Sequence, residues 1–366
     1  MSIKYFLSQE YCRLYNYINA FQEIFYPIRK ASKPATFEKK KAKIKNKLPL
    51  KLKQFKNSID MKLILMFLLL LFFQVNISKK IDIRGFSFDN VIIMTIQGKG
   101  EQYILNSATN ITLPNKIEIN NVEMTDHPVN YKVQGLTSDE NEIKLIWNEG
   151  TVVCTICKNM FADLINIIQI DLTNFDFSSV IDLTYFFGGC SSLKSVYLSN
   201  VNAENVKYMN SMFFGCRSLV SINFANFKTK NLETLEMCFE GCESLVSIDL
   251  SSFETPNLLI LSNFLYKCYS LKYINLNSFD TSKVTFMNGM FSNCKSLVSL
   301  NLSNFKTGAL RNTQEMFDQC NSLISIDLSS FYTPSLINIY KMFYNCSNLI
   351  YLDISNFNTS SVVDMS

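Results

Sequence analysis

Apolar and polar residues alternate over short stretches that recur with a 26-residue period along most of this chain. In one stretch, Ile248 and Leu250 alternate with Ser247, Asp249 and Ser251. A period of two indicates a short strand with one buried face. The segments 299–303, 325–329 and 351–355 carry the same alternation. We therefore predict one short strand in each repeat.

A different apolar spacing follows each strand. Val284, Met287, Met290, Phe291 and Cys294 are spaced so that they fit one face of a short helix. Glycines just before the cysteine in three repeats are typical of a helix end. The expected end residues are Gly189, Gly215 and Gly241. The spacing predicts a short helix in each repeat.

A threonine precedes each expected helix and is predicted to cap it. In two repeats proline follows, as in Thr255-Pro256, and proline suits the first helical position because it lacks a surplus N–H donor. The same position holds Thr229, Thr281, Thr307, Thr333 and Thr359. Each repeat is thus expected to contain a strand, a capped turn, a short helix and a second turn.

The repeat keeps a strict period. Seven cysteines recur at the same 26-residue interval: Cys190, Cys216, Cys242, Cys268, Cys294, Cys320 and Cys346. A strict period of this length is the signature of a solenoid, in which stacking neighbours bury a shared core. We predict the α/β class, with about eight 26-residue coils over residues 156–366, each holding one parallel strand and one short helix.

The repeat motif resembles a known family. Residues 290–307 read Met-Phe-Ser-Asn-Cys-Lys-Ser-Leu-Val-Ser-Leu-Asn-Leu-Ser-Asn-Phe-Lys-Thr. This is similar to the 26-residue repeat of surface proteins related to the BspA-like leucine-rich-repeat proteins. The resemblance covers residues 156–366 and implies a surface location, a role in adhesion and no catalytic residues. The first coil departs from it with Leu164 at the cysteine position, and the fifth has Phe264-Leu265 in place of Met-Phe.

The chain in front of the repeats divides into three segments. Residues 79–155 lack the period and contain strand-like runs between turn residues, so we expect a β-rich module that caps the first coil. Residues 61–78 contain the apolar run Met61–Val75, which fits a signal peptide or signal anchor. Residues 1–60 form a basic arm, or an extension upstream of a start at Met61. The last repeat stops mid-unit, so we expect further sequence or a partner to cover it.

Charge separates the front of the chain from the rest. Residues 1–78 carry 15 Lys or Arg and 4 Asp or Glu, a net charge of +11, whereas the remainder carries 20 and 27, a net charge of −7. The repeat region is therefore unsuited to polyanions, and we expect no nucleic-acid partner. The expected membrane contact is through Met61–Val75 if that segment is not cleaved.

The cysteines invite a metal or disulfide interpretation. In-register side chains point the same way, so we expect the cysteine column to be a ladder of small buried side chains, with some pairing still open in an oxidising compartment. Cys154 and Cys157 form a pair at metal-ligand spacing, and His127 is the one histidine. A disulfide or two buried thiols is favoured there over zinc. We expect no resident metal or cofactor.

No set of nucleophile, base and orienting group can be assembled, so we expect no enzyme. The candidate contacts are residues that project from the strands: Tyr197, Tyr273, Tyr351, Asp249, Asp327 and Asp353. Tyrosine is common at interaction hot spots. The competing interpretation of the aspartates is a solvent-facing hydrogen-bonding ladder. Sequons that permit N-glycosylation stand at Asn110, Asn301, Asn345 and Asn358.

The combined expectation is a cell-surface or secreted repeat protein. It would bind an extracellular protein or glycan through its sheet face. A structural spacer of a cell coat is one alternative, and an intracellular scaffold is another if the Met61–Val75 segment does not direct export.

Overall fold

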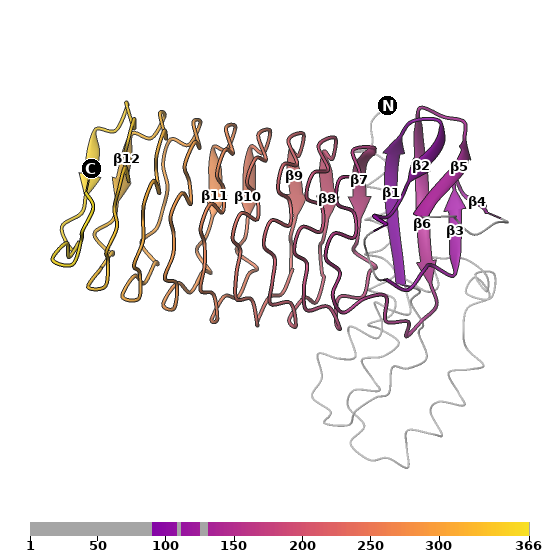
Figure 1. Ribbon diagram of the computed structural model, residues 1–366, viewed down its shortest axis with the longest axis horizontal. Helices are drawn as coiled ribbons and strands as arrows, with labels where there is room; N and C mark the ends of the chain where they lie inside the picture. Colours follow the sequence, from indigo (N-terminus) through magenta and orange to yellow (C-terminus); the bar gives the residue numbers. More distant parts are fainter. Residues whose placement is uncertain (1–89, 108–110, 125–130, 366) are drawn as a thin grey trace, which may run out of the picture. The chain divides into compact units, whose positions relative to one another are not determined.

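The computed structural model describes residues 90–107, 111–124 and 131–365, which all belong to one compact unit, Arg84–Ser366. In this unit, coils of chain lie side by side in sequence order, from the strand labelled β7 to the C-terminus (Figure 1). The predicted solenoid is confirmed. The segments assigned to 1–60 and 61–78, including Met61–Val75, lie outside the described residues.

Six strands precede the coils and build the N-terminal module. They are β1 (Asn90–Gln97), β2 (Gly100–Tyr103), β3 (Lys116–Ile119), β4 (Val122–Glu123), β5 (Lys132–Leu136) and β6 (Glu140–Trp147). Alternate residues of β1 and β6 are buried, as a half-buried strand requires. Trp147 is fully buried, and its indole N–H donates to the Thr112 carbonyl over 2.7 Å.

Seven short strands follow in the coils. They are β7 (Ile167–Asp171), β8 (Ser195–Tyr197), β9 (Ser221–Asn223), β10 (Ser247–Asp249), β11 (Tyr273–Asn275), β12 (Ser325–Asp327) and β13 (Tyr351–Asp353). Where coil strands pair, they run parallel with a 26-residue register, for example Ile248 opposite Ile274. The coil between β11 and β12 contributes only an isolated bridge, Ser299 to Ser325, in place of a strand.

The N-terminal module continues the sheet of the coils. Strand order in the largest sheet is β4-β3-β6-β1-β7-β8-β9, and β1 lies antiparallel to both β6 and β7. In that pairing Met94 stands opposite Ile170. The edge of β7 that faces the module is therefore hydrogen-bonded to β1 and is not free to pair with another chain.

The predicted α/β class, with a short helix in each coil, is wrong. The described residues contain strands and turns and no helix, so the fold is a β-solenoid. Residues within the expected helices adopt positive φ, for example Gly289 (61°) and Asn293 (62°). A left-handed residue at every fourth position interrupts a right-handed helix, because the two hands cannot follow one another within a turn.

Hydrogen bonding explains what replaces the helix. The amides of Met287, Gly289, Phe291 and Asn293 donate to carbonyls of the next coil over 2.7–3.0 Å. The amides of Met290 and Ser292 donate three residues back in tight turns, over 3.2 and 3.1 Å. Successive three-residue turns place apolar residues at the same spacing as a short helix does. The spacing seen in the sequence therefore fits either structure. Half of the amides bind the neighbouring coil, so this segment is a second ladder along the stack.

The threonines predicted as helix caps also join coils. Thr281 Oγ1 donates to the Lys306 carbonyl over 3.0 Å and accepts the Lys306 amide over 2.8 Å. Equivalent donor bonds of 2.9–3.4 Å start from Thr229, Thr255, Thr307 and Thr333. These five threonines are almost fully buried. The capping prediction is wrong, because each hydroxyl satisfies a buried peptide group of the following coil.

Phenylalanines fill the core between coils. Phe187, Phe213 and Phe239 stack with ring centroids 5.3 Å apart, at interplanar angles of 19° and 5°. A second stack runs through Phe305, Phe331 and Phe357, with centroids 6.3 and 5.8 Å apart. Offset stacked rings are favourable beyond the area that they bury. The two recurring aromatic positions of the sequence are therefore core packing.

Candidate functional site

The strand face consists of two outward-facing columns, one on either side of the buried strand residue. In β10, Ser247 and Asp249 are exposed while Ile248 is buried. The first column, here called the Ser/Tyr column, holds Gln169, Ser195, Ser221, Ser247, Tyr273, Ser299, Ser325 and Tyr351. The second, the Asp/Asn column, holds Asp171, Tyr197, Asn223, Asp249, Asn275, Asn301, Asp327 and Asp353. All six candidate contact residues therefore lie on one face.

The three candidate tyrosines are exposed to different degrees. Tyr273 and Tyr351 are 58% and 55% exposed and share the Ser/Tyr column, three coils apart. Tyr197 is 38% exposed and stands in the Asp/Asn column, opposite Asn223. The structure thus brings Tyr273 and Tyr351 onto one line and places Tyr197 on the neighbouring one.

The Asp/Asn column ends each strand with a turn. Asp249 Oδ1 accepts the backbone N–H of Ser251 over 3.0 Å, and Asp327 Oδ1 accepts that of Ser329 over 2.8 Å. The same bond, at 2.9–3.2 Å, forms at Asp171, Asn223, Asn275, Asn301 and Asp353. Asp and Asn favour this turn because a short side-chain acceptor reaches the amide two residues on. The competing ladder interpretation is thus partly right, since one oxygen of each side chain is structural.

Asp353 and Tyr351 form a small electrostatic pair at β13. The pKa of Asp353 is lowered, chiefly because its carboxylate accepts the Ser355 backbone N–H. The pKa of Tyr351 is raised because the negative charge of Asp353 opposes ionisation of the phenol. The Tyr351 hydroxyl donates to Asp353 Oδ2 over 3.4 Å. At neutral pH the tyrosine is therefore a neutral donor beside a carboxylate.

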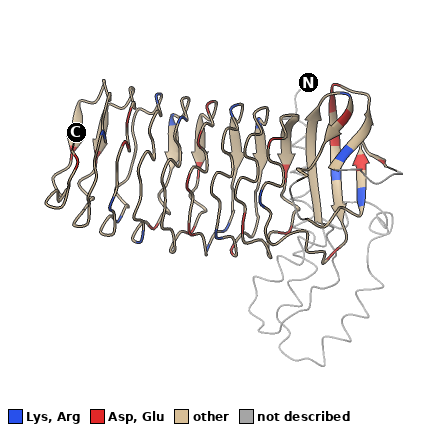
Figure 2. Cartoon of the chain, viewed as in Figure 1, with Lys and Arg blue, Asp and Glu red and all other residues tan. Residues whose placement is uncertain are grey.

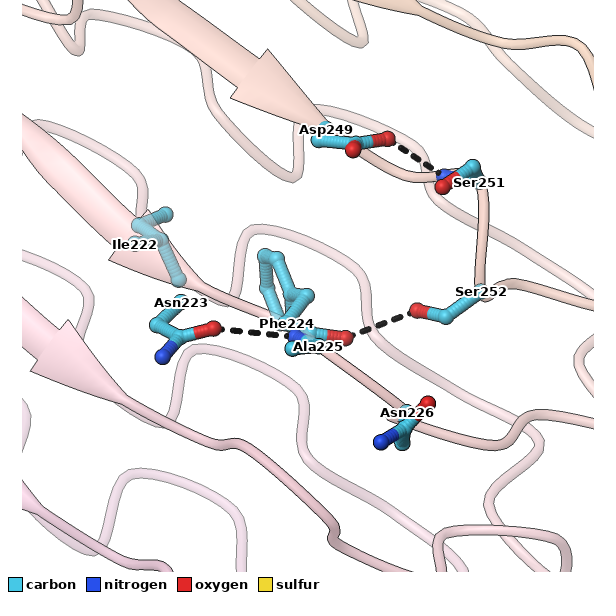
Figure 3. A pocket seen from close by; sticks show the side chains of 8 residues that line it. All are labelled: Ile222, Asn223, Phe224, Ala225, Asn226, Asp249, Ser251 and Ser252. Atoms are coloured by element: carbon cyan, nitrogen blue, oxygen red, sulfur yellow. Dashed lines mark hydrogen bonds between the residues drawn. The ribbon is translucent and has the colours of Figure 1, made fainter. Parts of the chain in front are cut away.

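A shallow pocket of about 420 Å³ opens at the ends of β9 and β10. Figure 3 shows Asn223 and Asp249 on neighbouring strands, each bonded to the turn that follows its own strand. In the pocket lining, the Ser252 hydroxyl donates to the Phe224 carbonyl over 2.7 Å. The pocket lies where strand pairing is interrupted, since β9 ends one sheet and β10 begins another. Two of its polar lining residues, Asn223 and Asp249, belong to the Asp/Asn column.

The cysteine column is buried, as the sequence predicts, and its thiols are free. Six of the seven are buried and Cys346 is half-buried. Each thiol donates to a carbonyl of the preceding coil over 2.9–3.4 Å, as Cys216 does to Phe187. Burial raises the pKa of Cys190 to about 12 and that of Cys294 well above its usual value. Thiols held protonated in this way are poor nucleophiles and poor metal ligands.

Cys154 and Cys157 are joined by a disulfide at the boundary between the module and the first coil. This is one of the two outcomes favoured over zinc from the sequence. Within the described ranges, no cluster of three or more His, Cys, Asp or Glu side chains is arranged to hold a metal.

A family model described as "Mycoplasma protein of unknown function, DUF285" matches residues 155–274 and 259–366. The two matches together span more than half of the 366-residue chain. The chain belongs to this family. No curated protein and no solved structure matched it. The matched residues coincide with the coils, so the DUF285 pattern is the solenoid repeat itself.

The glycosylation candidates occupy different places on the DUF285 coils. Asn301 is exposed in the Asp/Asn column, and Asn345 is exposed in a turn with φ 55°. Asn358 is half-buried, and Asn110 lies outside the described residues. Asn301 Oδ1 already accepts from the backbone and hydroxyl of Ser303. A glycan at Asn301 would cover the strand face, whereas one at Asn345 would lie on a turn.

An exposed aliphatic column beside the strand face escaped the sequence-based prediction. Its members, between 40% and 86% exposed, are Val220, Val246, Val298, Ile324 and Ile350. They follow the 26-residue period, one position before the Ser/Tyr column, with Lys194 and Lys272 in the same series. The period was visible in the sequence, but β-branched residues beside a strand were indistinguishable from core. They extend the available surface with apolar contact area.

No helix among the described residues is long and apolar enough to cross a membrane. The apolar run Met61–Val75 lies outside the described residues.

Proposed function

We propose that this DUF285 protein is a non-enzymatic binding protein that engages an extracellular protein or glycan through its strand face. The observation that carries the proposal is the pair Tyr273 and Tyr351, more than half exposed and aligned in one column. A large aromatic side chain has few rotatable bonds, so it offers contact area at low entropic cost. Both rings lie on the strand face and outside the core.

The coils supply a rigid platform for these side chains. The turn ladder joins the coils along the whole stack, while strand pairing joins several neighbouring coils and the threonine bonds join those from Thr229 onward. Backbones fixed in this way hold the tyrosines at constant separation, which lowers the entropy lost on binding. Solenoids commonly present extended binding surfaces for the same reason.

Placement at the cell surface or in the secreted fraction is the second part of the proposal. The apolar run Met61–Val75 has the length of a signal segment. The Cys154–Cys157 disulfide is favoured in an oxidising compartment. The motif at 290–307 supports kinship with BspA-like surface proteins.

The test uses the purified full chain, coupled to beads so that many copies act together, because weak contacts gain strength by multivalency. Beads are incubated with cells and matrix preparations, and retention is counted. We expect retention by the native chain and at least a tenfold loss for the Tyr273→Ser, Tyr351→Ser double variant. Tyr332→Ser is the matched control, since Tyr332 is 62% exposed but lies beyond its strand, next to Thr333.

If beads carrying the double variant and beads carrying the Tyr332→Ser control are retained equally, the strand face does not take part in binding. If the native chain is retained by nothing tested, the binding proposal fails and the spacer alternative replaces it.

A further inference from the structure

The Asp/Asn column repeats polar groups at a fixed interval along the coils. Parallel neighbouring strands lie about 4.8 Å apart. Because one oxygen of each side chain is bonded to its own turn, the direction of the other terminal atom is also fixed. From Asn223 to Asp327 the column is therefore a row of pre-oriented polar atoms, one per coil.

The outward atoms of this row are both donors and acceptors. Asn223, Asn275 and Asn301 present an amide nitrogen, while Asp249 and Asp327 present a carboxylate oxygen. Among the described residues, the side-chain hydrogen bonds of these five residues involve only the oxygen that faces the turn. A ligand that satisfies a mixed row needs groups that both donate and accept. Hydroxyl groups have this property.

The interval favours a sugar chain over an extended peptide. A peptide strand advances about 3.3 Å per residue, so its polar groups drift out of register with a row spaced at about 4.8 Å. A pyranose unit of an extended β-linked polysaccharide advances by close to one coil spacing. Each sugar can then meet one coil, and successive sugars can repeat the same contact.

The two exposed tyrosines of the Ser/Tyr column also suit a sugar chain as the ligand. Tyr273 and Tyr351 lie three coils apart in the adjacent column, or about 14 Å at the usual strand spacing. Their rings are amphipathic, with an apolar face and a polar hydroxyl. The C–H face of a pyranose can stack on such a ring while its hydroxyls reach the Asp/Asn column. Two platforms at this separation fix a sugar chain along the coil axis.

Charge decides between neutral and acidic sugars. The Asp/Asn column carries carboxylates at Asp171, Asp249, Asp327 and Asp353, and neither column contains Lys or Arg. Figure 2 shows basic segments scattered among the coils. Like charges brought together without a counter-charge are unfavourable, so sulfated or carboxylated chains are disfavoured.

We propose that the strand face binds an extended neutral polysaccharide that lies along the coil axis, with sugars stacked on Tyr273 and Tyr351 and hydrogen-bonded to the Asp/Asn column. This rests on the proposed binding function and names its ligand class. The pocket between Asn223 and Asp249 provides a further place for a sugar.

The experiment measures the fraction of purified full chain that sediments with insoluble cellulose and with chitin, and the fraction retained on immobilised heparin. Soluble cellohexaose and chitohexaose serve as competitors. We expect sedimentation with at least one neutral polymer, competition by its hexasaccharide and no preferential retention on heparin. The Tyr273→Ala, Tyr351→Ala double variant should bind at least tenfold more weakly, and Tyr332→Ala should bind as the native chain does.

A second variant addresses the column without disturbing the turn. Asp327→Asn retains the acceptor that the Ser329 amide needs, and Asn already fills this column at Asn275 and Asn301. It exchanges an outward acceptor for a donor, so we expect about a threefold to tenfold loss of polysaccharide binding with an unchanged melting temperature.

The outcomes separate this inference from the proposed function. Sedimentation that is equal for the double variant and Tyr332→Ala overturns the assigned face, and preferential retention on heparin overturns the ligand class. If no polysaccharide binds while bead-coupled chain still adheres to cells through Tyr273 and Tyr351, the glycan inference fails and the binding function stands, with a protein as the partner. If neither binding is seen, both fail.

Discussion

Single polar atoms hold consecutive coils together. Thr281 Oγ1 both donates to and accepts from Lys306, one coil further on, and Cys294 Sγ donates to Leu265 of the preceding coil over 3.4 Å. Both side chains are small enough for the core and still satisfy a buried peptide group. A purely apolar residue of the same size would leave that group unpaired, at a cost of about 1–3 kcal/mol.

Replacing Thr281 with valine tests this role. The change retains the shape but removes both hydrogen bonds to Lys306, so we expect the free energy of unfolding to fall by about 1–3 kcal/mol. Thr359→Val is the matched control, because Thr359 occupies the same column but is exposed and should lose less than about 0.5 kcal/mol. Urea denaturation measures both. Equal losses at the two positions would mean that the hydroxyl does not join coils.

The buried thiols make stability depend on pH in the alkaline range. Burial raises the pKa of Cys190 to about 12, whereas a thiol in an unfolded chain has a pKa of about 8.5. The stabilising contribution is therefore complete below about pH 8.5 and is lost as the pH rises toward the folded pKa, by about 1.4 kcal/mol per unit for this thiol.

Urea denaturation at pH 8 and pH 10, in the native chain and in Cys190→Ala, measures this dependence. The variant should be less stable at pH 8 because it leaves a cavity, yet it should lose less stability than the native chain between the two pH values. Identical losses would show that Cys190 is not held protonated in the fold.

At the scale of the element, the sequence pattern locates the strands and the inward-facing residues, whereas the hydrogen bonds define the backbone path between them. The alternation of Ile248 and Leu250 with polar neighbours located the strands, and the 26-residue period fixed their parallel register. The spacing from Val284 to Cys294 marked which residues face inward but not how the backbone turns between them. Consecutive three-residue turns and a short helix bury the same positions, and only the path of the amides to the next coil separates them.

For the candidate site too, the sequence predicted which residues are exposed but not the detailed geometry around them. Tyr273, Tyr351 and Asp327 were placed on an exposed strand face because strand alternation puts them opposite the buried Ile and Leu positions. The turn bond from the Ser329 amide to the Asp327 carboxylate could not be foreseen, because the pattern does not specify how the strand ends. The pocket at Asn223 and Asp249 depends on the interrupted pairing of β9 and β10, which the period itself does not contain.

Gly241 lies in the left-handed region, where alanine is unfavourable. Its φ is 73°, and an added Cβ would meet only Gly215 backbone atoms at 3.5–3.6 Å, an ordinary contact. Alanine at a left-handed position costs about 1–2 kcal/mol. We expect Gly241→Ala to lower the melting temperature. Gly308→Ala, where the added Cβ has open space, should leave it nearly unchanged.

At the scale of the whole molecule, the solenoid is a stack in which contacts repeat between neighbours. The bridge ladder runs without a break from Ile156 through each coil to Asp364. Stability in such an array is close to a sum of coil and interface contributions. Register therefore matters more than the identity of any one coil, and the strand face keeps its geometry only while every coil begins in phase.

Deleting chain in and out of phase tests this account most directly. Removal of residues 270–295 takes out one 26-residue coil and joins Tyr269 to Ser296, so strand still stacks on strand. Removal of residues 283–295, half a coil, would stack strand on turn. Thermal unfolding of the full chain and both variants, followed by circular dichroism, is the measurement. We predict one cooperative transition at a lower temperature for the 26-residue deletion and no cooperative transition of the coils for the 13-residue deletion. Cooperative unfolding of both variants at similar temperatures would contradict the solenoid and the strand face built on it.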